Sequence, residues 1–273
     1  MPRFSANLSM LYGELPFMER FAAAAADGFE AVEYVGAYEH KPEDIKAQLE
    51  AHGLTQALFN LPAGDWGGGE RGIACHPDRI AEFREGVDRA IVYAQATGCT
   101  QLNCLAGIAP TGMGRDDLEA VVIDNLRYAA PRLSAAGIKL LLEPINTRDI
   151  PGFFINSTDD YERIAKAVGH DNLYLQYDFY HMQIVQGDLI FGFKRLQSRI
   201  AHVQIADNPG RHEPGTGEIN YPNIFRVLDE AGYSGWVGAE YKPKAGTSSG
   251  LGWFKESGRE YRHIYNREIT KLL

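Results

Sequence analysis

The sequence predicts a single (β/α)8 barrel spanning residues 1–273, and three observations lead to that fold class. Eight short apolar runs alternate with longer amphipathic stretches. Most of the amphipathic stretches end at a glycine that leads within a few residues into the next apolar run. No GxGxxG or GxxxxGK[ST] motif follows any of the runs, which removes the main support for a nucleotide-binding open sheet. Eight strands with helical connections therefore favour a closed barrel.

The apolar runs are rich in Val, Ile, Leu and Tyr and are mostly bounded by Gly, Pro, Asn or Asp. This composition is typical of parallel strands buried on both faces. In chain order, the predicted strands are Phe4–Ser9, Ala31–Val35, Gln56–Leu61, Gln101–Leu105, Ile138–Glu143, Leu173–Asp178, Ala201–Ala206 and Trp236–Tyr241.

The amphipathic stretches place apolar residues at helical spacing. A glycine just beyond the last of them enters the left-handed region without a Cβ clash and so ends the helix. The predicted helices, each with its closing glycine, are Phe17–Ala26 with Gly28, Pro42–Ala51 with Gly53, Arg79–Thr97 with Gly98, Asp116–Ala136 with Gly137, Thr158–Val168 with Gly169, and Tyr221–Ala231 with Gly232.

Two connections, residues 62–78 and 207–220, are longer than the fold requires. Both follow predicted strands, so both lie on the barrel face where βα loops build active sites. The first carries Arg71 among several glycines, which suggests a lid that closes over a ligand.

Composition narrows the class of partner. The formal net charge of −9 argues against nucleic acid, whereas a small anionic substrate needs only a few local cations. No apolar run is long enough to cross a membrane, and no basic-then-apolar leader opens the chain. Three cysteines without a CxxC pair do not indicate a disulfide framework. We therefore expect a cytoplasmic protein, and the sequence is compatible with a homo-oligomer.

Polar residues end four consecutive predicted strands. They are Glu143, Asp178, Gln204 and Glu240, and in a closed barrel they converge near the axis. Ionised carboxylates at the ends of apolar strands are costly, and like charges held together oppose full ionisation. A divalent cation resolves both problems. Because all four ligands would be oxygens, Mg²⁺ or Mn²⁺ is favoured over zinc.

Several stretches resemble the hydroxypyruvate isomerases, a branch of the xylose-isomerase-like TIM barrels, and the resemblance spans nearly the whole chain. The first of these stretches is Phe-Ser-Ala-Asn7, at the start of the chain. The other stretches are Asn60-Leu-Pro-Ala-Gly-Asp-Trp-Gly-Gly-Gly-Glu-Arg71, Glu143-Pro-Ile-Asn146, Asp178-Phe-Tyr-His181, Gln204-Ile-Ala-Asp207-Asn-Pro-Gly-Arg211, Gly215-Thr-Gly217-Glu218 and Glu240-Tyr-Lys242.

This resemblance implies an isomerase that interconverts hydroxypyruvate and tartronate semialdehyde through an enediolate held by a divalent metal. Glu143 and Glu240 would be the acid and base as well as metal ligands, together with Asp178 and Gln204. Many epimerases of the superfamily carry histidine where this chain has Gln204, so metal identity and metal dependence stay open. The residues expected to bind the sugar-acid substrate are Arg71, His181, Arg211, Lys242, Asn7 and Asn60.

Glu33 and Asn103 are weaker candidates for the polar wall of the substrate site. His202 lies one layer below Gln204 and is expected to have a structural role. The nearest alternative activity is a 2-oxo-tetronate isomerase acting on a four-carbon sugar acid. A ketose 3-epimerase is next and is disfavoured by Gln204. A metal-dependent endonuclease and a non-catalytic sugar-acid-binding barrel are the alternatives from other classes.

Overall fold

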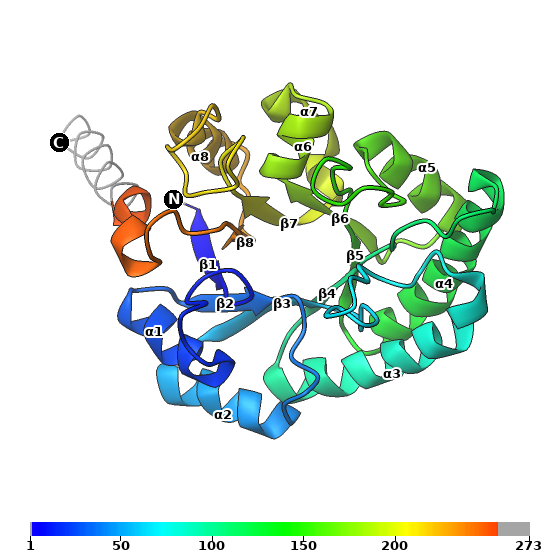
Figure 1. Cartoon of the computed structure of the whole chain (residues 1–273), viewed down its shortest axis with the longest axis horizontal. Helices are drawn as coiled ribbons and strands as arrows, with labels where there is room; N and C mark the ends of the chain where they lie inside the picture. Colours follow the sequence, from blue (N-terminus) through cyan, green and yellow to red (C-terminus); the bar gives the residue numbers. More distant parts are fainter. Residues whose placement is uncertain (1, 256–273) are drawn as a thin grey trace.

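In the computed structural model, eight parallel strands form a closed barrel in which each strand pairs with its neighbours in sequence and β8 pairs with β1 (Figure 1). The structure describes residues 2–255. The strands are β1 (Arg3–Asn7), β2 (Ala31–Tyr34), β3 (Thr55–Asn60), β4 (Gln101–Cys104), β5 (Lys139–Leu142), β6 (Leu173–Asp178), β7 (Ile200–Ile205) and β8 (Trp236–Ala239). The predicted fold class is confirmed. The predicted domain, residues 1–273, includes residue 1 and residues 256–273, which lie outside the described part of the chain.

Helices surround the barrel (Figure 1). They are α1 (Arg20–Ala26), α2 (Pro42–His52), α3 (Ile80–Thr97), α4 (Arg115–Ala135), α5 (Thr158–Val168), α6 (Phe179–Val185), α7 (Leu189–Leu196) and α8 (Tyr221–Glu230). The first predicted helix is divided in the structure into a 3-10 turn, Phe17–Glu19, and α1. Glycines with left-handed backbone follow several helices, as at Gly53 after α2 and Gly169 after α5, because the chain must reverse there into the next strand.

Helices α6 and α7 were not predicted. Helix α6 has only seven residues, and the four residues of its first turn are all buried, so no polar face reveals a helical period. It starts directly after β6, where the side chain of Asp178 accepts a hydrogen bond from the backbone N–H of Tyr180. This cap brings His181 within one turn of the end of β6.

Strand register sets the heights of the residues at the carboxyl ends. Asp178 of β6 lies beside Gln204 of β7, and Gln204 lies beside Gly238 of β8. Ala239, the residue before Glu240, pairs with Ile205. The last residues of these strands therefore reach the same mouth of the barrel.

Within the described residues, no helix combines the length and apolar character needed to span a bilayer. The three cysteines are buried free thiols.

Candidate functional site

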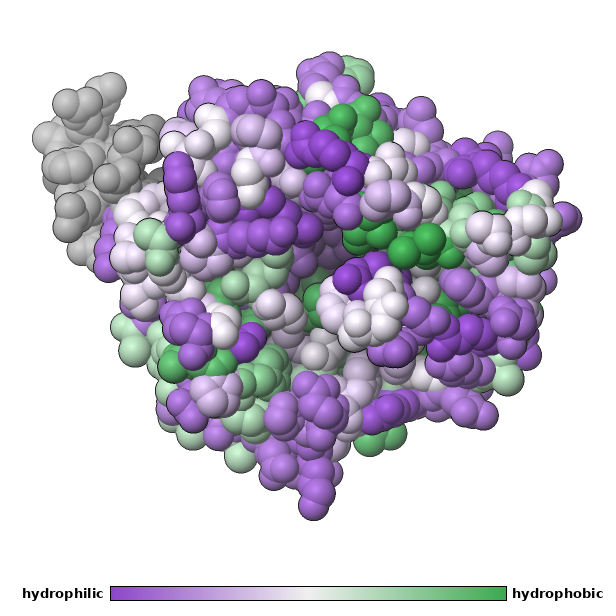
Figure 2. All heavy atoms as spheres, viewed as in Figure 1, coloured by the Kyte–Doolittle hydropathy of each residue, from purple (hydrophilic) through white to green (hydrophobic). Residues whose placement is uncertain are grey.

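The carboxyl ends of the strands open into a cavity of about 900 Å³. Figure 2 shows a hollow at the centre of the molecule in the same view. Polar groups at the strand ends line the cavity together with aromatic and aliphatic side chains from the loops. This size and mixed lining are usual for a site that binds a small molecule. The lining residues used below are Asn60, Trp66, Arg71, Glu143, Asp149, His181, Arg211, Glu240 and Lys242.

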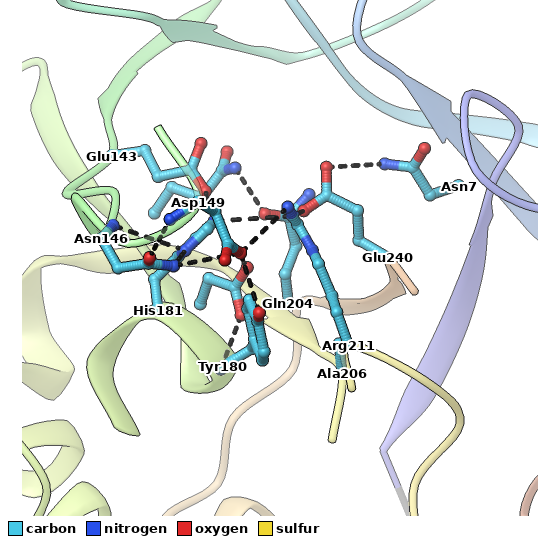
Figure 3. Close-up of polar contacts among 12 residues, drawn as sticks. Asn7, Glu143, Asn146, Asp149, Tyr180, His181, Gln204, Ala206, Arg211 and Glu240 are labelled. Carbon is cyan, nitrogen blue, oxygen red and sulfur yellow. Dashed lines mark hydrogen bonds and ion pairs between the residues drawn. The ribbon is translucent and has the colours of Figure 1, made fainter. Parts of the chain in front are cut away.

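Three carboxylates and one imidazole lie close together at this end of the barrel, and Figure 3 labels three of the four residues, Glu143, His181 and Glu240. Glu143 follows β5, Asp178 ends β6, His181 lies on α6 and Glu240 follows β8. Each offers a ligand atom, and these atoms all lie within 4.8 Å of one another. Glu143, Asp178 and His181 are at most 4% exposed. The structure thus brings together the three acids that the sequence predicted to converge.

Burial and mutual repulsion disfavour the charged forms of these acids. Burial raises the pKa of Glu143 well above its usual value, and the neighbouring Glu240 and Asp178 raise it further. Burial and the charge of Glu240 raise the pKa of Asp178 to about 7. Burial likewise raises the pKa of Glu240, although Arg211 opposes that shift. A bound cation would reverse these shifts.

One carboxylate oxygen in the cluster lacks a hydrogen-bond partner among the described residues. Oδ1 of Asp178 accepts the N–H of Tyr180 at 2.8 Å, whereas the buried Oδ2 has no hydrogen-bond partner, although Nε2 of His181 lies 3.5 Å away. An orphaned buried carboxylate oxygen beside two more carboxylates is a suitable environment for a divalent cation. The residues present therefore fit a divalent metal site.

Arg211 supplies the positive charge nearest to the cluster. Its Nη2 donates to Oε2 of Glu240 at 2.7 Å and lies 3.5 Å from Nε2 of His181. Its guanidinium stacks over the ring of Tyr180 and reaches within 4.0 Å of Asp149 (Figure 3). The backbone at Arg211 has a left-handed φ of 53°, which is uncommon for a residue other than glycine.

A buried carboxylate holds the loop that carries Arg211. Asp207 accepts hydrogen bonds from four backbone N–H groups, with N···O distances of 2.8–3.0 Å. These donors belong to Asn208, Gly215, Gly217 and Ile219. Because Asp207 accepts these four backbone N–H groups, it holds the loop in one conformation although the loop contains no strand or helix.

Gln204 belongs to a buried polar layer beneath the cluster. Its Nε2 donates to Oε1 of Glu33 at 2.8 Å, and its Oε1 accepts from Gln176 at 2.7 Å. Glu33 also accepts from Ser5 and contacts His202 Nε2 at 2.8 Å. Although burial opposes ionisation of Glu33, these partners lower its pKa. His202 is fully buried in this layer, in the place expected for a structural histidine.

The predicted asparagines lie on the early strands and support the acids. Asn103 donates to Oε2 of Glu143 at 2.9 Å. Asn7 lies between two carboxylates and donates to Glu33 at 3.2 Å and to Glu240 at 3.4 Å. Asn60 lines the cavity.

Arg71 and Lys242 also line the cavity, but on its wall. The guanidinium of Arg71 stacks over the ring of Trp66, 4.1 Å from its centroid, and donates to the carbonyls of Trp66 and Glu70. The backbone N–H of Lys242 donates to the carbonyl of Arg211 at 2.7 Å. Of the three predicted cations, Arg211 is the one that the structure joins to the cluster.

Sequence reasoning did not assign three residues that contact either the cluster or Arg211. Asn146, Asp149 and Tyr180 surround His181 and Arg211 (Figure 3). The available signal was position, because Asn146 and Asp149 lie in the loop that follows Glu143 and Tyr180 comes two residues after Asp178. Loops that follow barrel strands often carry functional side chains. Because these loops have no repeating pattern, the sequence does not show which way each side chain points.

Comparisons with known proteins agree with the barrel fold and identify the family. A model of the family described as xylose isomerase-like TIM barrel matches residues 21–257. The chain is 52% identical over 255 residues to a 2-oxo-tetronate isomerase of Cupriavidus necator, covering 93% of this chain and 98% of the relative. It is 50% identical over 253 residues to the hydroxypyruvate isomerase of Escherichia coli, again covering 93% and 98%.

Among solved structures, one described as an AP endonuclease, family 2, from Brucella melitensis superposes with a TM-score of 0.91 at 47% identity, covering 94% of this chain and 99% of that chain. A 3-keto-D-glucoside 4-epimerase from Escherichia coli has a TM-score of 0.78 at 21% identity, with the same coverage, and so supports the fold alone.

Proposed function

Because the chain belongs to the xylose isomerase-like TIM barrel family, and within it to the hydroxypyruvate and 2-oxo-tetronate isomerases, we propose that it interconverts hydroxypyruvate and tartronate semialdehyde. The observation that supports this proposal most strongly is the cluster of Glu143, Asp178, His181 and Glu240 beside Arg211. The reaction moves a proton from C3 to C2 of the substrate and exchanges the carbonyl and hydroxyl carbons, so it needs two proton carriers and groups that stabilise an enediolate.

Glu143 and Glu240 are the proposed proton carriers. They come from β5 and β8, and their carboxylate oxygens approach within 4.8 Å, which suits two groups that serve adjacent carbons. Burial raises the pKa of each glutamate above its usual value, which makes each a stronger proton acceptor than an ordinary carboxylate. Which of the two removes the first proton depends on the face of the substrate that is presented.

Arg211 is the proposed partner of the substrate carboxylate, since a guanidinium fork binds a carboxylate with two parallel hydrogen bonds. It now pairs with Glu240. When the substrate carboxylate takes over this partner, Glu240 loses a stabilising cation and becomes a stronger base. Substrate binding and activation of the base are thereby coupled.

The proposed cofactor is Mg²⁺ or Mn²⁺, which Glu143, Asp178 and Glu240 would hold. Gln204 would be the fourth ligand through its side-chain carbonyl oxygen, which accepts a hydrogen bond from Gln176 in this structure. When bound, the metal supplies positive charge that stabilises the enediolate oxygens. Asn103 and Asn7 hold the two glutamates in place while charge moves through the site. Arg71, Lys242 and Asn60 on the cavity wall are proposed to contact the remainder of the substrate.

A second candidate substrate is 2-oxo-tetronate, which has one more hydroxymethyl carbon and undergoes the same proton transfer. Two observations favour it: the 52% identity to a 2-oxo-tetronate isomerase, and a cavity of about 900 Å³ that exceeds the needs of a three-carbon acid. A nuclease activity has less support, because the chain carries a net charge of −9.

The test is a comparison of kcat/KM for hydroxypyruvate and 2-oxo-tetronate with Mg²⁺ present. Glu143→Gln and Glu240→Gln should each lower kcat by about 100-fold or more, because each removes a proton carrier. Glu85→Gln, an exposed site on α3, is the matched control and should retain wild-type rates. Turnover by both glutamine variants at the wild-type rate would reject the assigned roles, and no turnover of either acid by the wild type would reject the function.

A further inference from the structure

The side-chain amide of Asn146 has a defined orientation. The backbone N–H of Asp149 lies 2.8 Å from one amide atom of Asn146. Because a backbone N–H can only donate, that atom must be the carbonyl oxygen Oδ1. The amide nitrogen Nδ2 therefore points the other way, toward His181.

This orientation determines which ring nitrogen of His181 lacks a proton. Nδ2 of Asn146 lies 2.6 Å from Nδ1 of His181, and the backbone N of Asn146 lies 3.5 Å from the same atom. Both neighbours are donors, so Nδ1 must present a lone pair. A neutral imidazole with a free Nδ1 carries its proton on Nε2.

The surroundings of Nε2 agree with that assignment. Nε2 faces Oδ2 of Asp178 at 3.5 Å and Oε1 of Glu143 at 4.0 Å, and both atoms are acceptors when the carboxyl groups are ionised. Nη2 of Arg211 is also 3.5 Å away, but it already donates to Glu240 at 2.7 Å. A contact of 3.5 Å does not compete with one of 2.6 Å for the orientation of the ring.

We propose that Asn146 is a positioning residue that holds His181 in the tautomer protonated at Nε2, so that His181 donates a hydrogen bond to a substrate oxygen and does not coordinate the metal. The imidazole belongs to the cluster by distance, but a protonated nitrogen has no lone pair to give to a cation. In the proposed reaction, the Nε2–H is directed at the oxygen on which negative charge develops. The tautomer follows from the contacts alone, whereas its catalytic use rests on the proposed function.

The direct test is nitrogen NMR of the metal-free protein with ¹⁵N-labelled histidine. Proton-to-nitrogen correlations through two and three bonds distinguish a protonated from an unprotonated ring nitrogen. The chain has eight histidines, and the signals missing from His181→Gln identify His181. We expect protonated Nε2 and unprotonated Nδ1, and addition of Mg²⁺ should leave the proton on Nε2. A proton on Nδ1, or metal-dependent loss of the Nε2 proton, would overturn the proposal.

The second arm uses Asn146→Asp. The new carboxylate can still accept from Asp149 N–H, but its other oxygen now requires a donor, so the proton of His181 should move to Nδ1. Thr147→Asp is the matched control, because it adds the same charge at the next, exposed position. We expect kcat to fall about 100-fold in Asn146→Asp with a smaller change in KM, and Thr147→Asp to behave as wild type.

An Asn146→Asp protein in which His181 stays protonated on Nε2 and unprotonated on Nδ1 would refute the positioning role. If that variant does not fold, the wild-type spectrum still decides the tautomer. If neither acid is turned over, the spectrum of the metal-free protein remains interpretable, so failure of the proposed function is distinguishable from failure of this inference.

Discussion

Replacing Arg211 tests the proposed link between substrate binding and the buried acids. Arg211→Met removes the guanidinium while keeping much of the apolar stem, and Arg211→Lys keeps a charge without the planar fork. In the structure, the guanidinium and the carboxylate of Glu240 are 2.7 Å apart, with side chains only 15% and 13% exposed. Water therefore cannot substitute well for either partner.

The expected effect on binding follows from the strength of a charged hydrogen bond. Such a bond contributes about 1.5–3 kcal/mol, which corresponds to a rise in KM of about 10- to 150-fold for Arg211→Met. Arg211→Lys should fall between wild type and Arg211→Met. Initial rates measured over a range of hydroxypyruvate and 2-oxo-tetronate concentrations give KM and kcat separately. A KM within about twofold of wild type in Arg211→Met would refute the assignment of this residue to the substrate carboxylate.

The same variant has a predicted effect on stability. Breaking a buried ion pair costs about 3–5 kcal/mol when the remaining charge persists. Glu240 can instead bind a proton, because losing Arg211 raises its pKa further. A raised folded-state pKa means that stability falls as pH rises through that pKa. Urea unfolding of the metal-free variant should therefore show a larger loss at about pH 8 than at about pH 5. A loss that does not depend on pH would contradict this reasoning.

Three further substitutions test other parts of the structure. Gly238→Ala should lower the free energy of unfolding by about 2–4 kcal/mol, because its Cβ would lie 2.3 Å from Oε1 of the fully hydrogen-bonded Glu33; unchanged urea unfolding would contradict this. Asp178→Asn should stabilise the metal-free protein by about 2–4 kcal/mol at pH 8 and by little at pH 4. The pKa of Asp178 is raised to about 7, so the folded wild-type protein loses stability as pH rises from about 4 to about 8. Calorimetry that shows the stabilisation of Asp178→Asn at pH 4 and not at pH 8 would be evidence against this reasoning. Arg71→Ala should raise KM severalfold by removing the stack on Trp66 that orders the cavity wall, and an unchanged KM would end the lid hypothesis.

The fold was predictable because the barrel repeats one pattern. Buried parallel strands read as continuous apolar runs, so β6 could be placed at Leu173–Asp178 from its sequence alone, and glycine endings fixed the helices. Repetition also located the acids, since residues at the ends of successive strands must share one mouth. Helices α6 and α7 lack such a pattern. The first turn of α6 is buried throughout, and α7 is only eight residues long and opens with the apolar Leu189, Ile190 and Phe191, of which Phe191 is exposed.

Side-chain partners were less accessible to prediction. The amide nitrogen of Gln204 donates to Glu33, and the amide nitrogen of Asn146 lies beside Nδ1 of His181. Both contacts depend on strand register and loop geometry, which cannot be inferred from any single residue. Arg211 was expected to bind the substrate, but neither its pairing with Glu240 nor the left-handed backbone at its own position was predicted. These contacts come from the tertiary structure, where a shift of one residue changes every partner.

The central claim is that this site moves a proton between adjacent carbons of a 2-oxo acid. The most direct measurement is NMR of hydroxypyruvate incubated with the enzyme and Mg²⁺ in D₂O. We predict formation of tartronate semialdehyde and incorporation of deuterium at the reacting carbons, both lost in the Glu143→Gln, Glu240→Gln double variant. Binding of hydroxypyruvate and 2-oxo-tetronate without conversion or deuterium incorporation would contradict the claim and leave a sugar-acid-binding barrel.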